Sequence, residues 1–297
     1  MVCPARASGR ILAAYCLSLR GLTVPLKRLV GVVLAVLLVH GAPAQAAGEQ
    51  SKVELWETVL KPQYFQDRPI SSDQAIVELR LPVRAEDSGV VPISVNAKIP
   101  QTAERYVKTV YVIIDKNPRP LAGTFHLTPE AGRADLAMRL RVNEFTYVRV
   151  IAEMNNGELH MDSGYTRASG GCSEPPPFLK LQESRKRIGE MKFRASKETG
   201  SAADEVALGQ LMISHPNITG MQLDQRTRAF IPAEYVTKVE IRYNGAHILT
   251  AETDISISED PSFRFFFKPK KGGGSLEARM TDSKGREVTR TFPVDHS

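Results

Sequence analysis

Hydrophobic and polar residues alternate in short runs over the first half of the chain, and this alternation is typical of half-buried β-strands. The residues Asn155-Asn156-Gly157 separate two of these runs and predict a tight hairpin turn, because Asn and Gly tolerate positive φ. Pro, Gly, Asn or Asp bounds each run. Together the runs predict an antiparallel sandwich with seven strands, at 76–81, 90–99, 107–115, 123–127, 136–142, 147–154 and 158–165.

The same alternation returns after residue 204 and predicts a second small sandwich of immunoglobulin-like size. Tyr243-Asn244-Gly245-Ala246 and Asp282-Ser283-Lys284-Gly285 predict two of its turns. The aromatic run at 263–267 suggests a binding surface, but its spacing in a strand favours core and domain interface. The six predicted strands are 205–214, 236–243, 246–252, 263–268, 276–281 and 286–293.

Two other stretches lack the strand pattern. Apolar residues at 53–67 recur at near-helical spacing and predict a short amphipathic helix, which Trp56 docks on the first sandwich. Residues 173–203 are rich in Pro, Lys, Glu, Ser and Gly and predict a flexible linker, in which a helix at 179–191 is only weakly indicated. We therefore expect an all-β protein with domains at 47–172 and 204–297.

The N-terminal residues have the pattern of a secretory signal. Five basic residues precede the apolar run 29–39, and Ala44-Gln45-Ala46 offers a small-residue cleavage site. The apolar run is too short for a membrane anchor, so we expect removal of residues 1–46 and a periplasmic protein of 251 residues (297 minus 46). Removal lowers the net charge from +6 to +1, so the basic balance of the whole chain does not indicate a nucleic-acid partner.

Cys172 is the cysteine that remains after removal of Cys3 and Cys16 with the signal, so an internal disulfide is excluded. Gly170 and Gly171 precede it and a run of three prolines follows shortly after, and we expect an exposed thiol on a movable arm. A buried spectator cysteine is the alternative. Neither a zinc-ligand cluster nor a haem-attachment motif is present, and we expect no metal and no cofactor.

The sequence gives little support for an enzyme. A nucleophilic thiol needs a positioned base, but spacing marks none of the histidines that follow the signal. The acidic pairs Glu86-Asp87 and Glu259-Asp260 lie beside predicted turns, and the glycines at 272–274 lack the Lys-Ser/Thr of a phosphate loop. These histidines are His126, His160, His215, His247 and His296.

The order of these features resembles a known family. A sandwich, then Gly170-Gly171-Cys172, then a second sandwich with Ser214-His215-Pro216-Asn217-Ile218-Thr219-Gly220-Met221-Gln222 and Phe230-Ile231-Pro232-Ala233 resembles a fusion of the SoxY and SoxZ subunits of the sulfur-oxidation carrier. Residues 256–263 continue the SoxZ-like pattern. Patterns at 81–87 and 91–92 look most like the single-chain SoxYZ-like carriers that are associated with quinoprotein dehydrogenases.

The resemblance implies a periplasmic carrier in sulfur or thiosulfate oxidation, on which a cysteine holds intermediates as covalent adducts. Carried over, it places the attachment point at Cys172 and the flexible arm at Gly170 and Gly171. Ser173-Glu174 stands where the family has glycines, and the arm continues into the chain. Expected partners are sulfur-oxidising or redox enzymes such as a quinoprotein dehydrogenase or a c-type cytochrome. The alternative is a non-catalytic accessory module of a quinoprotein dehydrogenase system, in which the thiol is dispensable.

Overall fold

The structure is a computed structural model that describes residues 55–72, 74–197 and 206–295. The predicted secretory signal at 1–46 lies outside these residues. No helix within them is long and apolar enough to span a membrane.

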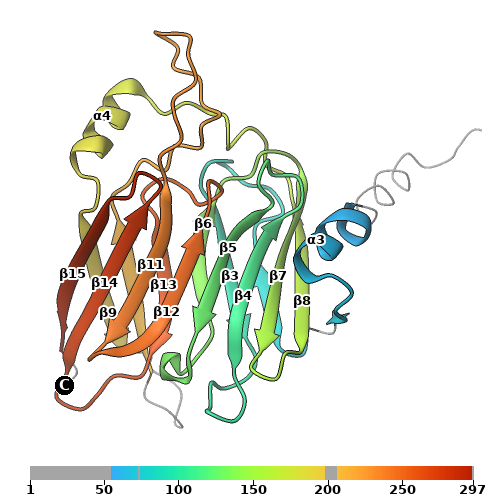
Figure 1. The fold of residues 1–297 in the computed structure, drawn as a ribbon, viewed down its shortest axis with the longest axis vertical. Helices are drawn as coiled ribbons and strands as arrows, with labels where there is room; N and C mark the ends of the chain where they lie inside the picture. The colour runs from blue at the N-terminus through green and yellow to red at the C-terminus, as the bar shows by residue number, and fades with distance from the viewer. Residues whose placement is uncertain (1–54, 73, 198–205, 296–297) are drawn as a thin grey trace, which may run out of the picture. The chain divides into compact units, whose positions relative to one another are not determined.

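Two β-sheets face each other and form the body of the protein (Figure 1). Neighbouring strands are antiparallel except for β1 and β8, which run parallel. The first sheet has the order β1 (Ile70–Ser71), β8 (Leu159–Thr166), β7 (Thr146–Met154), β4 (Val107–Ile114), β5 (Leu121–Leu127), β12 (Ala246–Thr253), β11 (Val236–Tyr243), β14 (Gly274–Asp282), β15 (Glu287–Val294). The second has the order β2 (Val77–Arg80), β3 (Val91–Ala97), β6 (Leu136–Leu140), β13 (Ser262–Phe267), β10 (Ala207–Ile213), β9 (Met191–Lys197).

The two halves of the chain share both sheets. Strand β5 of the first half pairs with β12 of the second, from Leu127 opposite Leu249 to Gly123 opposite Thr253. In the other sheet β6 meets β13 at Ala137 and Arg264. The all-β immunoglobulin-like architecture is confirmed, but its two sandwiches are joined edge to edge. Pairing of this kind satisfies the backbone N–H and C=O groups that each isolated half would leave open at its edge.

The core lies between the sheets and continues across the two halves. Alternate residues of β10 and β14 are buried, as the period-two pattern predicts. Phe263, Phe265, Phe266 and Phe267 are all buried, which confirms the preference for core over binding surface. The rings of Phe125 and Phe263 lie 6.1 Å apart and join the packing of the first half to that of the second.

The predicted N-terminal helix is present as a π-helical turn, Trp56–Leu60, followed by α3 (Lys61–Phe65). Trp56 is buried against the first half, as expected, and the Arg149 guanidinium lies 4.5 Å from the centre of its ring. Arg149 in turn makes a buried bidentate ion pair with Asp115. Together these contacts fix the helical segment on the outer face of the first sheet.

The stretch that we predicted to be a flexible linker at 173–203 contains two regular elements. Helix α4 (Phe178–Lys186) covers most of the weakly indicated helix, and β9 pairs with β10 along its whole length. The strand is hard to recognise because only Met191 and Phe193 supply apolar side chains toward the core, among Lys and Arg residues.

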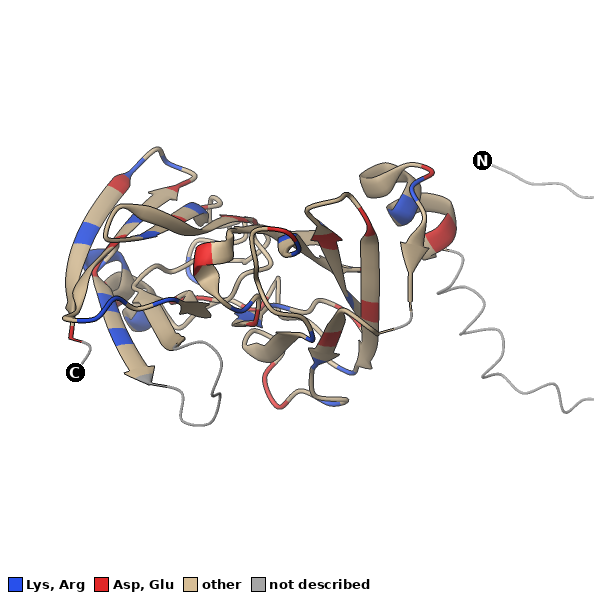
Figure 2. Ribbon diagram, turned by 90° about the horizontal axis from the view of Figure 1, so that it is seen from below, with Lys and Arg blue, Asp and Glu red and all other residues tan. Residues whose placement is uncertain are grey.

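All three predicted turns join strands as expected. Gly157, Asn244, Gly245 and Gly285 have positive φ at these turns. Figure 2 shows charged residues of both signs on the strands at the end of the sandwich that carries the C-terminus. Charged side chains on an edge strand such as β15 oppose pairing with another chain.

Candidate functional site

The segment between β8 and α4, residues 167–177, carries the predicted attachment residue and is called the cysteine loop here. Figure 1 shows the chain passing across the top end of the sandwich, from β8 in the first half to α4 beside the second half. Hydrogen bonds from the loop to Val142 and Thr219 place Cys172 where the two halves of the chain meet.

Cys172 is a free cysteine and is fully buried, so our expectation of an exposed thiol is wrong. The cysteine loop is folded back on itself, since the N–H groups of Ser173 and Glu174 both donate to the Gly170 carbonyl at 3.0 Å. It is also tied to the residues that follow β6, because Gly170 donates to Asn143 and Gly171 to Val142.

The two glycines of the predicted arm have different structural roles. Gly170 has φ +88°, and a Cβ added there would meet nothing within 4 Å. A Cβ on Gly171 would lie 2.0 Å from the Ser88 carbonyl oxygen, a backbone atom that cannot easily move aside. Gly170 thus allows the turn, whereas Gly171 allows the cysteine loop to pack against the first half.

The second half covers the loop with residues 214–222, called the seat segment here. The Thr219 hydroxyl donates to the Cys172 carbonyl at 2.6 Å, and the Gln222 side-chain amide donates to the Glu174 carbonyl at 3.2 Å. Both side chains are buried. The local sequence around Cys172 supplies no apolar cover, and these distant residues hold the loop in the position in which Cys172 is buried.

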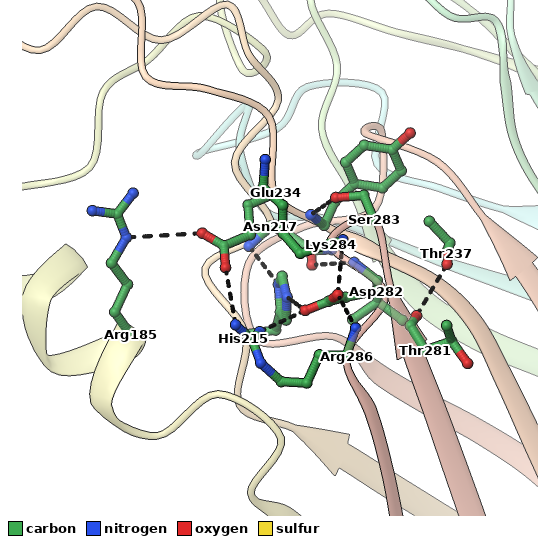
Figure 3. Close-up of polar contacts among 12 residues, drawn as sticks. Arg185, His215, Asn217, Glu234, Thr237, Thr281, Asp282, Ser283, Lys284 and Arg286 are labelled. Atoms are coloured by element: carbon green, nitrogen blue, oxygen red, sulfur yellow. Dashed lines mark hydrogen bonds and ion pairs between the residues drawn. The ribbon is translucent and has the colours of Figure 1, made fainter.

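A polar network, buried at His215, Asn217 and Asp282 and reaching the surface at its arginines, holds the seat segment in place (Figure 3). His215 accepts a hydrogen bond from the Asn217 N–H at 3.0 Å, and its other ring nitrogen lies 3.5 Å from Asp282. Asp282 also binds Arg286 at 2.5 Å, and Glu234 links Arg286 to Arg185 of α4. Burial lowers the pKa of the His215 imidazole, although the Asp282 carboxylate opposes the shift, so the ring is neutral at pH 7.

Asn217 shapes the backbone of the seat segment. Its φ is +43°, which Asn adopts more readily than most residues. Its side-chain amide donates to the carbonyls of Ile257 and Ser258 and accepts from the Val236 N–H. Asn217 and its three partners all belong to the second half. These contacts therefore hold Thr219 in a fixed position against the cysteine loop.

Arg141 is the buried cation of the site. It follows β6 and is 5% exposed, and its Nη1 donates to the Gly171 carbonyl at 3.2 Å. Nη2 lies 3.4 Å from the Asn217 carbonyl, so this side chain contacts both the cysteine loop and the seat segment. Burial lowers the pKa of the Arg141 guanidinium, and nearby anionic groups oppose that shift.

The Cys172 thiol has low nucleophilic reactivity in this arrangement. Burial raises the pKa of Cys172 to about 11, and the positive charge of Arg141 offsets this only in part. Since each pKa unit is a factor of ten, only about one thiol in 10⁴ is ionised at pH 7 in the docked loop. The thiolate is the nucleophile, so the docked loop protects Cys172 from reaction.

The structure does not bring the other candidate residues to the thiol as a catalytic set. His126 and His247 lie on the paired strands β5 and β12, and His160 lies on β8. The ring of His215 contacts Asn217 and Asp282, and His296 lies outside the described residues. Among residues 55–72, 74–197 and 206–295, no three His, Cys, Asp or Glu side chains are grouped to hold a metal ion.

Sequence reasoning missed Arg141, Thr219 and Gln222. The latter two lie in the 214–222 motif on which the family resemblance rests, but no pattern indicated that they contact the cysteine loop. Arg141 stands at the end of a predicted strand and carries no signal in a single sequence.

Two family models match the chain. Residues 61–172 match the sulfur oxidation protein SoxY, and residues 193–293 match the sulphur oxidation protein SoxZ. The SoxY match ends at Cys172, and together the two matches cover both sandwiches. SoxY and SoxZ proteins are carrier and accessory proteins rather than catalytic enzymes.

The solved structures that match part of the chain include the sulfur carrier protein SoxY from Chlorobium limicola f thiosulfatophilum. It is 19% identical with a TM-score of 0.33, over 42% of this chain and 98% of that one. A superoxide reductase (neelaredoxin) variant from Ignicoccus hospitalis is 13% identical with a TM-score of 0.31, over 34% of this chain and 94% of that one. No curated protein matches the chain. Given the two family matches and their order, the chain is a SoxYZ-like fusion, with a SoxY family domain followed by a SoxZ family domain.

Proposed function

We propose that this protein carries a sulfur-containing intermediate as a covalent adduct on Cys172 and presents it to partner enzymes. The observation that carries the proposal is the position of Cys172. It is a free cysteine at the end of the SoxY family match, on a loop that both family domains contact. A sulfur-oxidation carrier needs one such attachment atom.

In this proposal, the conformation in which the cysteine loop contacts the seat segment is the resting state of the carrier. Loading requires the cysteine loop to leave the seat segment, because the thiol is buried and protonated where it lies. Side-chain hydrogen bonds from Thr219, Gln222 and Arg141 hold the loop from outside it. Each of these hydrogen bonds contributes about 1 kcal/mol net to the closed loop. The binding energy of a partner enzyme is therefore sufficient to release the loop.

We further propose a periplasmic location and a partner among periplasmic sulfur-oxidising or redox enzymes. The basic and apolar residues of the N-terminal 46 positions support export. The resemblance to single-chain carriers associated with quinoprotein dehydrogenases supports a quinoprotein dehydrogenase or its c-type cytochrome as the partner.

A second candidate function is a non-catalytic accessory module whose thiol is dispensable. The complete burial of Cys172 favours it, since a spectator cysteine is usually buried and inert.

The substitution Cys172→Ser distinguishes the carrier from the accessory module. Cells that depend on the protein for sulfur oxidation should lose that activity with Cys172→Ser, while the purified variant keeps the fold and melting temperature of the wild type to within a few degrees. Intact mass of wild-type protein from the native periplasm should show an adduct on Cys172. Full activity of Cys172→Ser in cells would select the accessory module and reject the carrier.

A further inference from the structure

The second sheet has a basic outward face that extends from β3 to β9 and is called the basic face here. Met138, Phe265 and Leu211 point into the core, so the residues that alternate with them along each strand point outward. The five strands β3, β6, β13, β10 and β9 contain no Asp or Glu, and four of their outward side chains are cations. The cations are Arg139 of β6, Arg264 of β13, and Lys192 and Arg194 of β9.

The cations of the basic face have no carboxylate partner. Arg139 donates to the backbone carbonyl of Asp260 at 2.7 Å, and none of the four cations forms an ion pair with a described Asp or Glu side chain. Arg264 and Arg194 both stand opposite Gln210 of β10. Since neighbouring strands are about 4.8 Å apart, the backbones that carry these two arginines are about 10 Å apart. Like charges at this distance do not stabilise the fold, so stability does not explain the basic face.

The outward face of the first sheet, in contrast, combines charges of both signs. Lys238 of β11 pairs with Glu240 on the same strand at 3.1 Å, and Arg279 of β14 pairs with Glu287 of β15 at 2.6 Å. The net charge of residues 47–297 is only +1, which is +6 minus the five cations of the first 46 residues. The basic face is therefore a local concentration of charge and not a result of the overall composition.

A groove of about 360 Å³ lies on the basic face, at the seam where β6 of the first half meets β13 of the second. Pro92, Ala137 and Met212 line it with apolar atoms, and Arg139 and Arg264 line it with charge. No Asp or Glu lines the groove, and no residue of the cysteine loop or of the seat segment does so. The groove thus combines an apolar floor with unpaired cations at a place distinct from the attachment residue.

We propose that the basic face is a docking surface for an acidic surface of a partner protein, which places an apolar side chain in the groove. The four cations lie on strands from β6 to β9, which span about 14 Å at the usual strand spacing. One small anion cannot reach all of them, whereas several carboxylates on a protein surface can. Arg and Met are enriched in protein interfaces, and complementary charge speeds encounter and selects the partner. A partner docked here contacts both halves of the chain.

Photo-crosslinking in cells that produce the full-length protein tests for this partner. The photo-reactive amino acid p-benzoyl-phenylalanine replaces Gln210, which lies between Arg194 and Arg264 on the basic face. Mass spectrometry then identifies the peptide that becomes attached. We expect a peptide from another protein, in which Asp and Glu outnumber Lys and Arg. The same amino acid in place of Thr281, which points outward from β14 of the first sheet, is the matched control and should give far less product.

Charge reversal tests the role of the arginines. Arg194→Glu combined with Arg264→Glu should lower the crosslinking yield at least about tenfold, which corresponds to about 1.4 kcal/mol of binding free energy. Arg242→Glu combined with Arg290→Glu is the matched control. It makes the same change in net charge on β11 and β15, where each arginine donates to a nearby backbone carbonyl. Melting curves of the purified variants confirm folding, and Arg194→Gln with Arg264→Gln replaces the first pair if that pair unfolds.

A charge swap completes the test. Replacing the acidic residues of the crosslinked partner peptide with Lys should restore crosslinking to the protein with Arg194→Glu and Arg264→Glu. Four results would each overturn the docking surface: no crosslink above that of the Thr281 position, a peptide from a second copy of this chain, a product without an excess of acidic residues (a lipid included), or equal losses in the two double variants. Crosslinking is repeated with Cys172→Ser, since docking on this face does not need the thiol, so the carrier function and the docking surface can fail independently.

Discussion

Cys172 is buried although its immediate neighbours in the sequence are small or polar. The loop is held in place by residues that are far away along the chain, among them Thr219, whose hydroxyl donates to the Cys172 carbonyl at 2.6 Å. At the scale of single residues, the reactivity of the thiol is therefore set by a few side chains that hold the loop closed.

Replacing Thr219 with Val should make Cys172 easier to label. The change removes the hydroxyl donor, and a hydrogen bond with a net value of about 1 kcal/mol corresponds to an approximately fivefold larger open population. The labelling rate with a thiol reagent under native conditions should rise by the same factor. Thr253→Val is the control, because Thr253 is also buried and donates to a carbonyl, Val236, at 2.7 Å away from the cysteine loop. An unchanged rate for Thr219→Val would contradict this account.

The free energy of unfolding should decrease at alkaline pH because of Cys172. The thiol has a pKa of about 11 in the folded protein, which is above its value in the unfolded chain, about 8.5. Below pH 8.5 the thiol is protonated in both states, and above it the unfolded chain ionises first. Stability is then lost by up to about 1.4 kcal/mol per pH unit until pH 11. Urea unfolding at pH 8 to 10, with reductant, should show a steeper loss in the wild type than in Cys172→Ala, because Tyr111, whose pKa is raised to about 12, contributes the same small loss in both proteins.

At the scale of elements, the cysteine loop depends on close packing at one glycine. Gly171→Ala should displace the loop, because the new Cβ would lie 2.0 Å from the Ser88 carbonyl oxygen. We expect rapid labelling of Cys172 at neutral pH and a lower pKa of its thiol, with the sandwich intact by circular dichroism.

Gly170→Ala is the matched control for this loop. It meets no atom within 4 Å and changes only the backbone preference at φ +88°, which costs about 1–2 kcal/mol for a residue with a Cβ. Its labelling rate should therefore increase much less. Equal rates in the two variants would show that backbone strain, rather than the contact with Ser88, decides whether the loop docks.

The elements that could be predicted from the sequence are those whose signal is local. Asn244 and Gly245 determine a hairpin by their own φ preferences, and the alternation at 263–267 shows which face is buried. Strand β9 was missed because its pairing with β10, rather than its composition, makes it a strand. The burial of Cys172 was missed for the same physical reason, since the residues that hold its loop, such as Arg141 and Thr219, lie far away along the chain.

At the scale of the whole molecule, the two family domains should unfold together. Leu249 of β12 is fully buried and pairs with Leu127 of β5, so Leu249→Ala should destabilise both halves by about 2–5 kcal/mol. The midpoint of urea unfolding reported by Trp56 fluorescence, which senses the first half, should fall together with that from circular dichroism. Separate midpoints for the two signals would mean that the shared sheets do not couple the halves.

The pairing of β5 with β12 also has a consequence for how the carrier behaves on dilution. When a seat and its loop belong to separate polypeptides, the fraction of assembled carrier falls as both become scarce. Here one covalent chain supplies both, so their association is intramolecular and does not depend on protein concentration. Every thiol is made with its own seat in a fixed one-to-one ratio, and the carrier remains assembled however few copies a cell contains.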